Sequence, residues 1–203
     1  MIVIIDYGMG NLGSVFNMIK KIGFECQISS DKETIKSASK LILPGVGAFE
    51  NGMTQLKKLD LIKILNHKVL IEKTPILGIC LGMHLMTNFS EEGNVHGLGW
   101  VNATTKKFSF NELKKLKIPH MGWNLIKPNK DHPLFNNLSE NSKFYFVHSY
   151  YVSCIDSSDS AAITKYGFDF TCVLVKNNIM ATQFHPEKSH KYGFHLLNSF
   201  LEL

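Results

Sequence analysis

The sequence contains no arginine. All 22 basic residues are lysine, against 17 acidic residues, for a formal net charge of +5. Nucleic-acid sites typically use arginine for two-pronged contacts with guanine and phosphate, so we do not interpret the charge as a nucleic-acid surface. We interpret the densest lysine cluster as a solvated face, with a docking surface for a partner as the alternative; the cluster comprises Lys106, Lys107, Lys114, Lys115 and Lys117. A carboxylate substrate would have to be held by backbone amides or a lysine.

Long hydrophobic runs are missing as well. No stretch of about 18 apolar residues is present, so we expect no membrane span and no membrane partner. The chain starts MIVIID, without a basic leader or a cleavage signal, which predicts a cytoplasmic protein. Its 203 residues and 44% hydrophobic content are typical of a single globular domain covering 1–203.

Cysteine is sparse and shows no paired spacing. The four cysteines are Cys26, Cys80, Cys154 and Cys172, and none belongs to a C-x-x-C pair. They are too few for the framework of a disulfide-rich domain, so we expect all four to be reduced. We interpret three of them as small core residues. Only Cys80 lies in a setting that favours reactivity.

Short apolar runs alternate with helical patterns along the first half of the chain. This alternation predicts an α/β fold with a largely parallel sheet. We expect strands at 2–5, 25–29, 40–43 and 75–79, and helices at 11–22, 52–71 and 81–88. The second half predicts strands at 100–110, 144–152, 161–164, 171–175 and 179–184, some of them in hairpins, and a final helix at 192–201.

Cys80 is the centre of the segment Gly78-Ile79-Cys80-Leu81-Gly82. The segment is the cysteine counterpart of the G-x-S-x-G elbow, in which a sharp strand-to-helix turn exposes a nucleophile. A thiolate is the attacking form, and a helix start or a nearby cation favours it. The segment therefore predicts acyl transfer through a thioester.

The base for this nucleophile is predicted in the segment Gln183-Phe184-His185-Pro186-Glu187. Pro186 biases His185 toward an extended backbone, in which residues two apart share a face. Glu187 can then accept one ring N–H of His185 and fix its tautomer. Cys80, His185 and Glu187 thus form a candidate catalytic triad.

Stabilisation of an oxyanion is predicted from two backbone segments. The amide of Leu81 directly follows the nucleophile. The glycine-rich loop Pro44-Gly45-Val46-Gly47 follows a predicted strand, and its backbone can approach a ligand closely.

The segment Gly8-Met9-Gly10-Asn11-Leu12-Gly13 reads as a G-x-G-x-x-G dinucleotide motif. Such a motif would suggest a nucleotide-binding Rossmann protein. Asp6 stands just before it, however, and would place a carboxylate near the pyrophosphate. We therefore favour a tight turn between strand and helix.

Zinc is the other alternative. Cys80 and His84 are one helical turn apart, and His185-Pro186-Glu187 resembles the H-x-E of zinc deaminases. Because the accompanying P-C-x-x-C segment is missing, we predict no metal site.

The elbow at Cys80, the segment His185-Pro186-Glu187 and the loop Pro44–Gly47 together resemble the class I (triad) glutamine amidotransferases. Within that family, other segments are similar to HisH-type glutaminase subunits of imidazole glycerol phosphate synthases. These segments are 6–11 (DYGMGN), 119–124 (PHMGWN), 144–150 (FYFVHSY) and 185–189 (HPEKS). The resemblance covers essentially the whole chain.

The resemblance implies a three-layer flavodoxin-like fold with a mostly parallel mixed sheet, and hydrolysis of L-glutamine to glutamate and ammonia without a cofactor. It makes Cys80 the nucleophile, His185 the base and acid, and Glu187 the residue that orients His185. Its further implied sites are an oxyanion hole at Val46, Gly47 and Leu81, and substrate contacts at Gly45, Gly47, His84, Ser149 and Tyr150.

The resemblance also implies a partner. The family passes ammonia into a (βα)₈-barrel synthase subunit, which makes imidazole glycerol phosphate and the nucleotide AICAR in histidine biosynthesis. The positions that match this interface are Asn11, His120, Met121 and Trp123. We expect weak glutaminase activity from the subunit alone.

One residue departs from the family pattern: His84 stands where the family commonly has a glutamine that contacts the substrate. Related subunits also serve the amidation of bacterial surface-glycan sugars, and the triad does not distinguish the two pathways. A non-catalytic interaction subunit is a further alternative, in which the thiol of Cys80 would be incidental.

Overall fold

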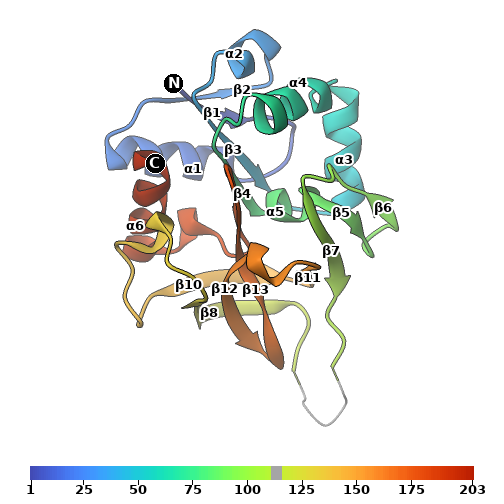
Figure 1. Ribbon diagram of the computed structural model, residues 1–203, viewed down its shortest axis with the longest axis vertical. Coiled ribbons are helices and arrows are strands. Elements are labelled where there is room, and N and C mark those ends of the chain that lie inside the picture. The colour runs from blue at the N-terminus through green and yellow to red at the C-terminus, as the bar shows by residue number, and fades with distance from the viewer. Residues whose placement is uncertain (111–115) are drawn as a thin grey trace.

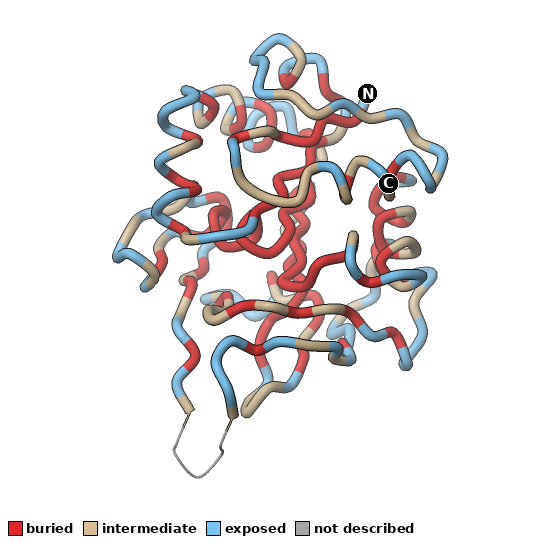
Figure 2. The backbone as a smooth tube through the Cα atoms, turned by 180° about the vertical axis from the view of Figure 1, so that it is seen from behind, coloured by how far each residue is buried: buried red, intermediate tan, exposed pale blue. Residues whose placement is uncertain are grey.

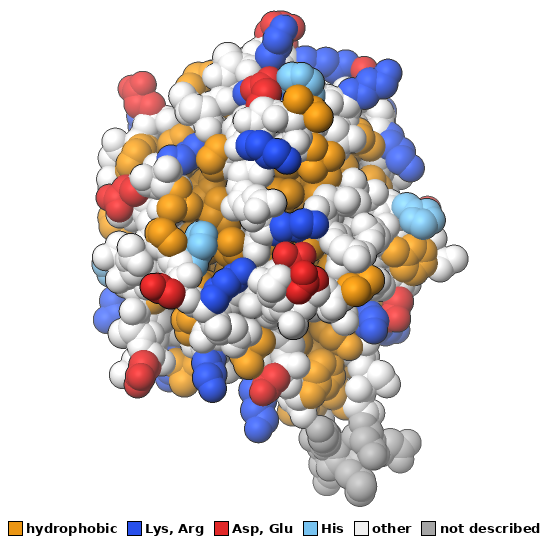
Figure 3. Space-filling model, in the orientation of Figure 1, with side chains coloured by type: hydrophobic (Ala, Val, Ile, Leu, Met, Phe, Trp, Pro, Cys, Tyr) orange, Lys and Arg blue, Asp and Glu red, His pale blue; other side chains and the backbone are white. Residues whose placement is uncertain are grey.

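The computed structural model describes residues 1–110 and 116–203 (Figure 1). Lys114 and Lys115 of the predicted lysine cluster lie outside the described residues. On the face shown in Figure 3, lysines are scattered among acidic side chains rather than gathered into one patch. Within the described ranges, no helix combines the length and the apolar character needed to cross a membrane.

A mixed sheet of 12 strands forms the centre of the described chain, in the order β2-β1-β3-β4-β14-β13-β11-β7-β5-β6, with β12 paired to β13 and β9 paired to β12. Strands β2, β1, β3, β4 and β14 are parallel neighbours. β8 and β10 form a separate antiparallel pair. The strands are β1 (Ile2–Ile5), β2 (Cys26–Ser29), β3 (Lys40–Gly45), β4 (Ile76–Cys80), β5 (Thr87–Ser90), β6 (Val95–His96), β7 (Val101–Lys107), β8 (His120–Leu125), β9 (Lys127–Pro128), β10 (Lys143–His148), β11 (Tyr150–Cys154), β12 (Ser160–Tyr166), β13 (Phe168–Lys176) and β14 (Ile179–Thr182).

Helices cover both faces of this sheet, which gives the three layers expected from the sequence (Figure 1). The helical segments are α1 (Leu12–Ile22), α2 (Lys32–Lys36), α3 (Phe49–Lys58), α4 (Ile62–Asn66), η1 (His67–Ile71), α5 (Leu81–Leu85), η3 (Pro133–Phe135), η4 (Ser157–Asp159), η5 (Pro186–Lys188) and α6 (His190–Glu202). α1 and α6 pack on one face, and α2 to α5 pack on the other.

The pattern of β1 shows why the predicted apolar runs form central strands. Ile2 and Ile4 belong to the core on the α1–α6 face, whereas Val3 and Ile5 belong to the core on the opposite face. Successive side chains in a strand point to opposite faces, so a strand covered on both sides needs a continuous apolar run. The central strands are accordingly the most buried part of the chain in Figure 2.

Three predicted elements differ from the structure. The helix expected at 52–71 is divided, because Asp60 takes a left-handed conformation (φ 51°) and the chain restarts as α4 and the π-helical turn η1. The helix expected at 81–88 ends at Leu85, where the Thr87 hydroxyl donates to the His84 carbonyl (2.8 Å). The strand expected at 144–152 is two strands, β10 and β11, which belong to different sheets and meet at Ser149.

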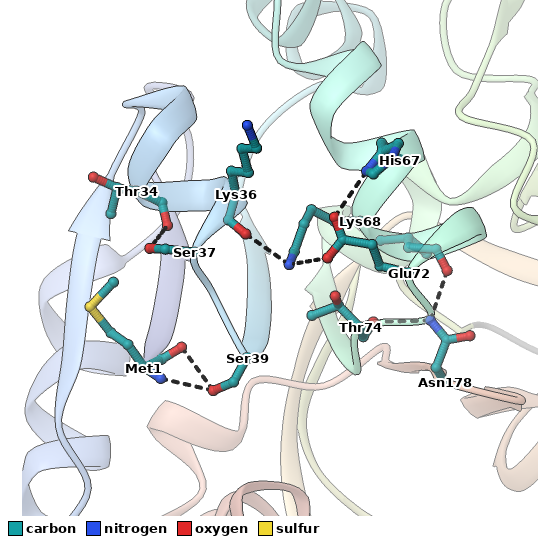
Figure 4. Close-up of polar contacts among 11 residues, drawn as sticks. Met1, Thr34, Lys36, Ser37, Ser39, His67, Lys68, Glu72, Thr74 and Asn178 are labelled. Carbon is teal, nitrogen blue, oxygen red and sulfur yellow. Dashed lines mark hydrogen bonds and ion pairs between the residues drawn. The ribbon is translucent and has the colours of Figure 1, made fainter.

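A buried lysine anchors η1 to the rest of the fold (Figure 4). Lys68 Nζ donates to the Lys36 carbonyl (2.9 Å) and pairs with Glu72 Oε2 (2.6 Å). The Lys68 side chain is 5% exposed, whereas that of Glu72 is 36% exposed and also contacts His67. If the pair were broken, water could therefore reach the Glu72 carboxylate but not the Lys68 ammonium.

We expect Glu72→Ala to destabilise the protein more than Lys68→Met. Loss of the carboxylate leaves a buried ammonium with a single backbone acceptor, whereas loss of the ammonium leaves a carboxylate that water can reach. Urea unfolding of the two variants measures the difference. Equal midpoints, or a lower midpoint for Lys68→Met, would contradict it.

Candidate active site

Cys80 is the last residue of β4 and immediately precedes α5. Its backbone angles, φ 53° and ψ −106°, are strained for a residue with a side chain. This is the elbow geometry predicted from the sequence. The register of β3 and β4 places Gly45 opposite Cys80, so the Pro44–Gly47 loop begins beside the sulfur.

His185 and Glu187 follow β14, the strand on the other side of β4. The backbone N–H of His185 donates to the Tyr145 carbonyl (3.0 Å), and its Nδ1 lies 2.8 Å from Glu187 Oε1. Both side chains are 2% exposed. Nδ1 therefore carries the proton that Glu187 accepts, which leaves Nε2 for proton transfer.

His185 also interacts with the Cys80 side chain. Burial by itself lowers the pKa of His185, but hydrogen bonding and charge interaction with Cys80 and Glu187 outweigh burial and raise the pKa to about 10. Nε2 has no hydrogen bond of standard geometry within the described chain. We therefore interpret the Cys80–His185 contact as a loose one, as is common in sites without substrate.

A pocket of about 280 Å³ opens over the sulfur. Most residues predicted from the sequence line it: Cys80 and His185 of the triad, Val46, Gly47 and Leu81 of the oxyanion segments, and His84, Ser149 and Tyr150. Two residues predicted for catalysis or substrate binding do not line the pocket. Glu187 contacts the ring of His185, and Gly45 is the last residue of β3. The pocket thus brings together segments from β3, β4, the β10–β11 junction and the end of β14.

Several lining residues were not predicted from the sequence. They are Glu92, Pro119, Val147, His148 and Lys188. Glu92 follows β5, and its Oε2 accepts the amide of Phe49 at the start of α3 (3.0 Å). No sequence spacing connects Glu92 with the triad, whereas Lys188 could have been found because it directly follows Glu187.

The glycine-rich turn after β1 supports the Pro44–Gly47 loop. A Cβ atom on Gly10 would lie 3.1 Å from the Gly45 nitrogen, so the two backbones are in close contact. Tyr7 Oη donates to the Pro44 carbonyl (2.7 Å), and burial, with a smaller effect of Cys80, raises the pKa of this hydroxyl. The Asp6 carboxylate accepts the Gly8 amide. The G-x-G-x-x-G segment therefore packs against the loop.

Gln183 is a second polar neighbour of the sulfur that the sequence argument missed. It is fully buried, and its Nε2 lies 3.9 Å from Cys80 Sγ. Its Oε1 lies 2.7 Å from His84 Nε2. Its position two residues before His185 was a usable signal, because a polar residue this near the predicted base can reach the same site.

The four positions predicted for a partner interface differ in exposure. Met121 and Trp123 of β8 are 62% and 47% exposed, and Trp123 stacks on His190. Asn11 caps α1 by accepting the Ser14 amide. His120 is buried, at 3% exposure.

A chain of hydrogen bonds connects His120 with the pocket. His148 Nδ1 lies 2.7 Å from the Tyr150 carbonyl, which can only accept, so Nδ1 is the donor. His148 Nε2 then accepts from His120 Nδ1 (2.9 Å), and His120 Nε2 accepts from the Asn124 amide (3.4 Å). Both rings are neutral in this arrangement. Burial lowers the pKa of His120 to about 4, and that of His148 well below its usual value.

These neutral histidines predict that the protein loses stability in acid. Burial also lowers the pKa of His84 to about 4. In the unfolded chain the three rings titrate near their ordinary pKa of 6.5, so between pH 6.5 and 4 the unfolded state binds more protons than the folded state. The contribution of these three rings to stability is therefore fully present above pH 6.5 and falls as pH falls, by at most about 1.4 kcal/mol per pH unit for each ring.

The variant His84→Gln isolates one of these rings. We expect its free energy of unfolding to fall by about 1.2 kcal/mol less than that of the unaltered chain between pH 6 and 5. Urea unfolding at several pH values measures both slopes. Identical slopes would mean that His84 is not held neutral.

Comparison with known proteins agrees with this geometry. The family model "Glutamine amidotransferase class-I" matches residues 3–203. A protein of Methanococcus maripaludis named imidazole glycerol phosphate synthase subunit HisH 2 is 59% identical over 202 residues, which is 100% of this chain and 99% of that protein. A protein of the same name from Pseudomonas aeruginosa is 45% identical over 203 residues and covers 100% of both chains.

Solved structures agree on the fold. The crystal structure of a glutamine amidotransferase superposes with a TM-score of 0.74 at 17% identity, covering 98% of this chain and 97% of that chain. The structure of PurLQS from Thermotoga maritima gives a TM-score of 0.72 at 17% identity, covering 99% and 97%. The flavodoxin-like architecture expected from the sequence is therefore confirmed.

Proposed function

The chain belongs to the class I glutamine amidotransferases, and on that premise we propose that it is the glutaminase subunit of an imidazole glycerol phosphate synthase in histidine biosynthesis. The observation that carries the proposal is the convergence of Cys80, His185 and Glu187 from the ends of two adjacent parallel strands. The full-length similarity to HisH subunits supports the pathway. It favours histidine biosynthesis over amidation of a surface-glycan sugar.

The first half of the reaction forms a thioester. Cys80 Sγ, as thiolate, adds to the side-chain carbonyl carbon of glutamine, and the carbonyl oxygen becomes an oxyanion. His185 Nε2 then gives its proton to the amide nitrogen, the C–N bond breaks, and ammonia leaves. Glu187 keeps the Nδ1 proton oriented throughout.

The second half releases glutamate. His185 Nε2 takes a proton from water as the water oxygen adds to the thioester carbon. The C–S bond then breaks, so the thiolate and the protonated imidazole are restored together. The new carboxylic acid ionises as glutamate leaves.

Backbone amides would hold the oxyanion in both halves. Leu81 follows the nucleophile, and Val46 and Gly47 line the same pocket. Amides that point at a developing negative charge in a site shielded from water stabilise the transition state strongly. This arrangement needs no arginine, which the chain lacks.

The ends of the substrate meet opposite charges. Glutamine carries an α-ammonium and an α-carboxylate, and the pocket contains Glu92 and Lys188. We assign Glu92 to the ammonium and Lys188, with the Ser149–Tyr150 backbone, to the carboxylate. His84 and Gly45 complete the substrate contacts expected from the sequence.

The ammonia would pass to a synthase subunit that binds beside the pocket. Met121 and Trp123 are exposed apolar side chains on β8, and Pro119, two residues before Met121, lines the pocket. We propose that this surface, with Asn11, binds a (βα)₈-barrel cyclase in the cytoplasm as a heterodimer. The chain itself would act as one domain.

Labelling with an electrophilic glutamine analogue tests the proposal. We expect Cys80 to be modified stoichiometrically and glutamine to protect it, while Cys26, Cys154 and Cys172 stay unmodified over the same period. Peptide mass spectrometry distinguishes the four thiols. Modification without preference for Cys80 would instead support a non-catalytic subunit.

A further inference from the structure

The buried amide of Gln183 links two groups that the proposed mechanism does not otherwise connect. Its oxygen faces His84 Nε2 at 2.7 Å, and its nitrogen faces the Cys80 sulfur at 3.9 Å. Gln183 is 0% exposed and His84 is 5% exposed, so solvent does not compete for these contacts.

When Cys80 is a thiolate, the hydrogen bonds from His84 to Gln183 and from Gln183 to Cys80 can be donated in only one direction. A thiolate only accepts, so the Gln183 –NH₂ group must face it, and the Gln183 carbonyl oxygen must face His84. His84 Nε2 must then carry the ring proton. A flipped amide would place its oxygen against the sulfur, and the thiolate would lose its Gln183 donor.

We propose that His84 and Gln183 are positioning residues that hold an amide donor against the Cys80 sulfur and so favour its thiolate form. Gln183 lies two residues before His185, just after the end of β14, and its Nε2 is the side-chain donor that lies 3.9 Å from the sulfur. His84 does not touch the sulfur and acts through Gln183. The inference deepens the proposed function, because it concerns the same nucleophile.

The burial of His84 makes this orientation independent of pH. Its lowered pKa, about 4, keeps the ring neutral at pH 7. A neutral ring with its proton on Nε2 donates to Gln183 without adding a charge beside the catalytic imidazole.

The test is the pH dependence of Cys80 alkylation by iodoacetamide, followed by mass spectrometry of the Cys80 peptide. The matched variants are Gln183→Met, which removes the donor, His84→Phe, which removes its orienting partner, and His84→Gln, which keeps a donor at that position. Cys80→Ala gives the background from the other thiols. The titratable groups that face the site are Tyr7, His84, Glu92, His148, His185 and Lys188.

We expect Gln183→Met to slow alkylation at pH 7 by about tenfold and to move the curve to higher pH, because a hydrogen bond to a charged group is lost. His84→Phe should shift the curve in the same direction by a smaller amount, and His84→Gln should stay within about twofold of the unaltered chain. A purely structural role for His84 would change the melting temperature without moving the alkylation curve.

Unchanged curves for folded Gln183→Met and His84→Phe would overturn the proposal. If either variant fails to fold, Gln183→Glu decides, because a carboxylate of the same shape should move the curve to higher pH, and an unmoved curve would overturn the proposal. Alkylation needs neither glutamine nor a partner subunit. It therefore reports on this inference even if the proposed glutaminase activity is not found.

Discussion

Replacement of Cys80 with alanine is expected to lower glutamine hydrolysis by about 10⁴-fold or more, because no other group at the pocket can form the thioester. The fold should persist, since the change removes only the sulfur atom, which lines a pocket. Glutamate release in the presence of the partner subunit and its ligand measures the effect. Retained hydrolysis in this variant would rule out the proposed nucleophile.

A second substitution at position 80 tests whether the backbone of Cys80 is strained. Cys80→Gly should be as inactive as Cys80→Ala but more stable than it by about 1 kcal/mol, because glycine adopts the φ of 53° at Cys80 without steric cost. Thermal unfolding compares the two variants. A glycine variant that is less stable than the alanine variant would mean that the elbow is not strained.

Replacement of Gly82 with alanine is expected to destabilise the protein by about 3 kcal/mol or more. A Cβ atom at this position would overlap the carbonyl oxygen of Leu43, where α5 crosses β3. The clash is with backbone, which a rotamer change cannot relieve. Because α5 carries Leu81 and His84, loss of glutaminase activity should accompany the loss of stability.

Gly13→Ala is the matched control for Gly82→Ala. Gly13 also lies in a helix, and a Cβ atom there would meet no atom within 4 Å. Alanine at an open helical position should stabilise the protein by about 0.5–1 kcal/mol. Urea unfolding of both variants tests the contrast, and a Gly82→Ala protein as stable as Gly13→Ala would contradict the close crossing of α5 over β3.

The sequence alone was sufficient for the parallel half of the fold because its strands are covered on both faces. The strands at 2–5 and 75–79 are continuous apolar runs, and the elbow follows the second directly. The proposed catalytic segments were recognisable because each follows such a strand and combines residue types with a shared chemistry.

Other parts of the site depend on contacts that no local pattern carries. The mostly apolar run at 144–152 predicts a single strand. In the structure it passes from one sheet to the other at Ser149, because β10 pairs with β8 and β11 pairs with β7. Glu92 reaches the pocket from a turn after β5. Gln183, the partner of His84, lies 99 residues away from it, so the contact between these two residues could not be inferred from a local pattern around His84.

The side-by-side placement of β3, β4 and β14 has a consequence for how the enzyme loses activity on heating. The oxyanion loop, the sulfur and the imidazole each continue from one of three hydrogen-bonded neighbours in the middle of the sheet. The pairing of these three strands holds the three groups near one another for as long as the sheet is folded. Heat inactivation should therefore coincide with global melting rather than precede it.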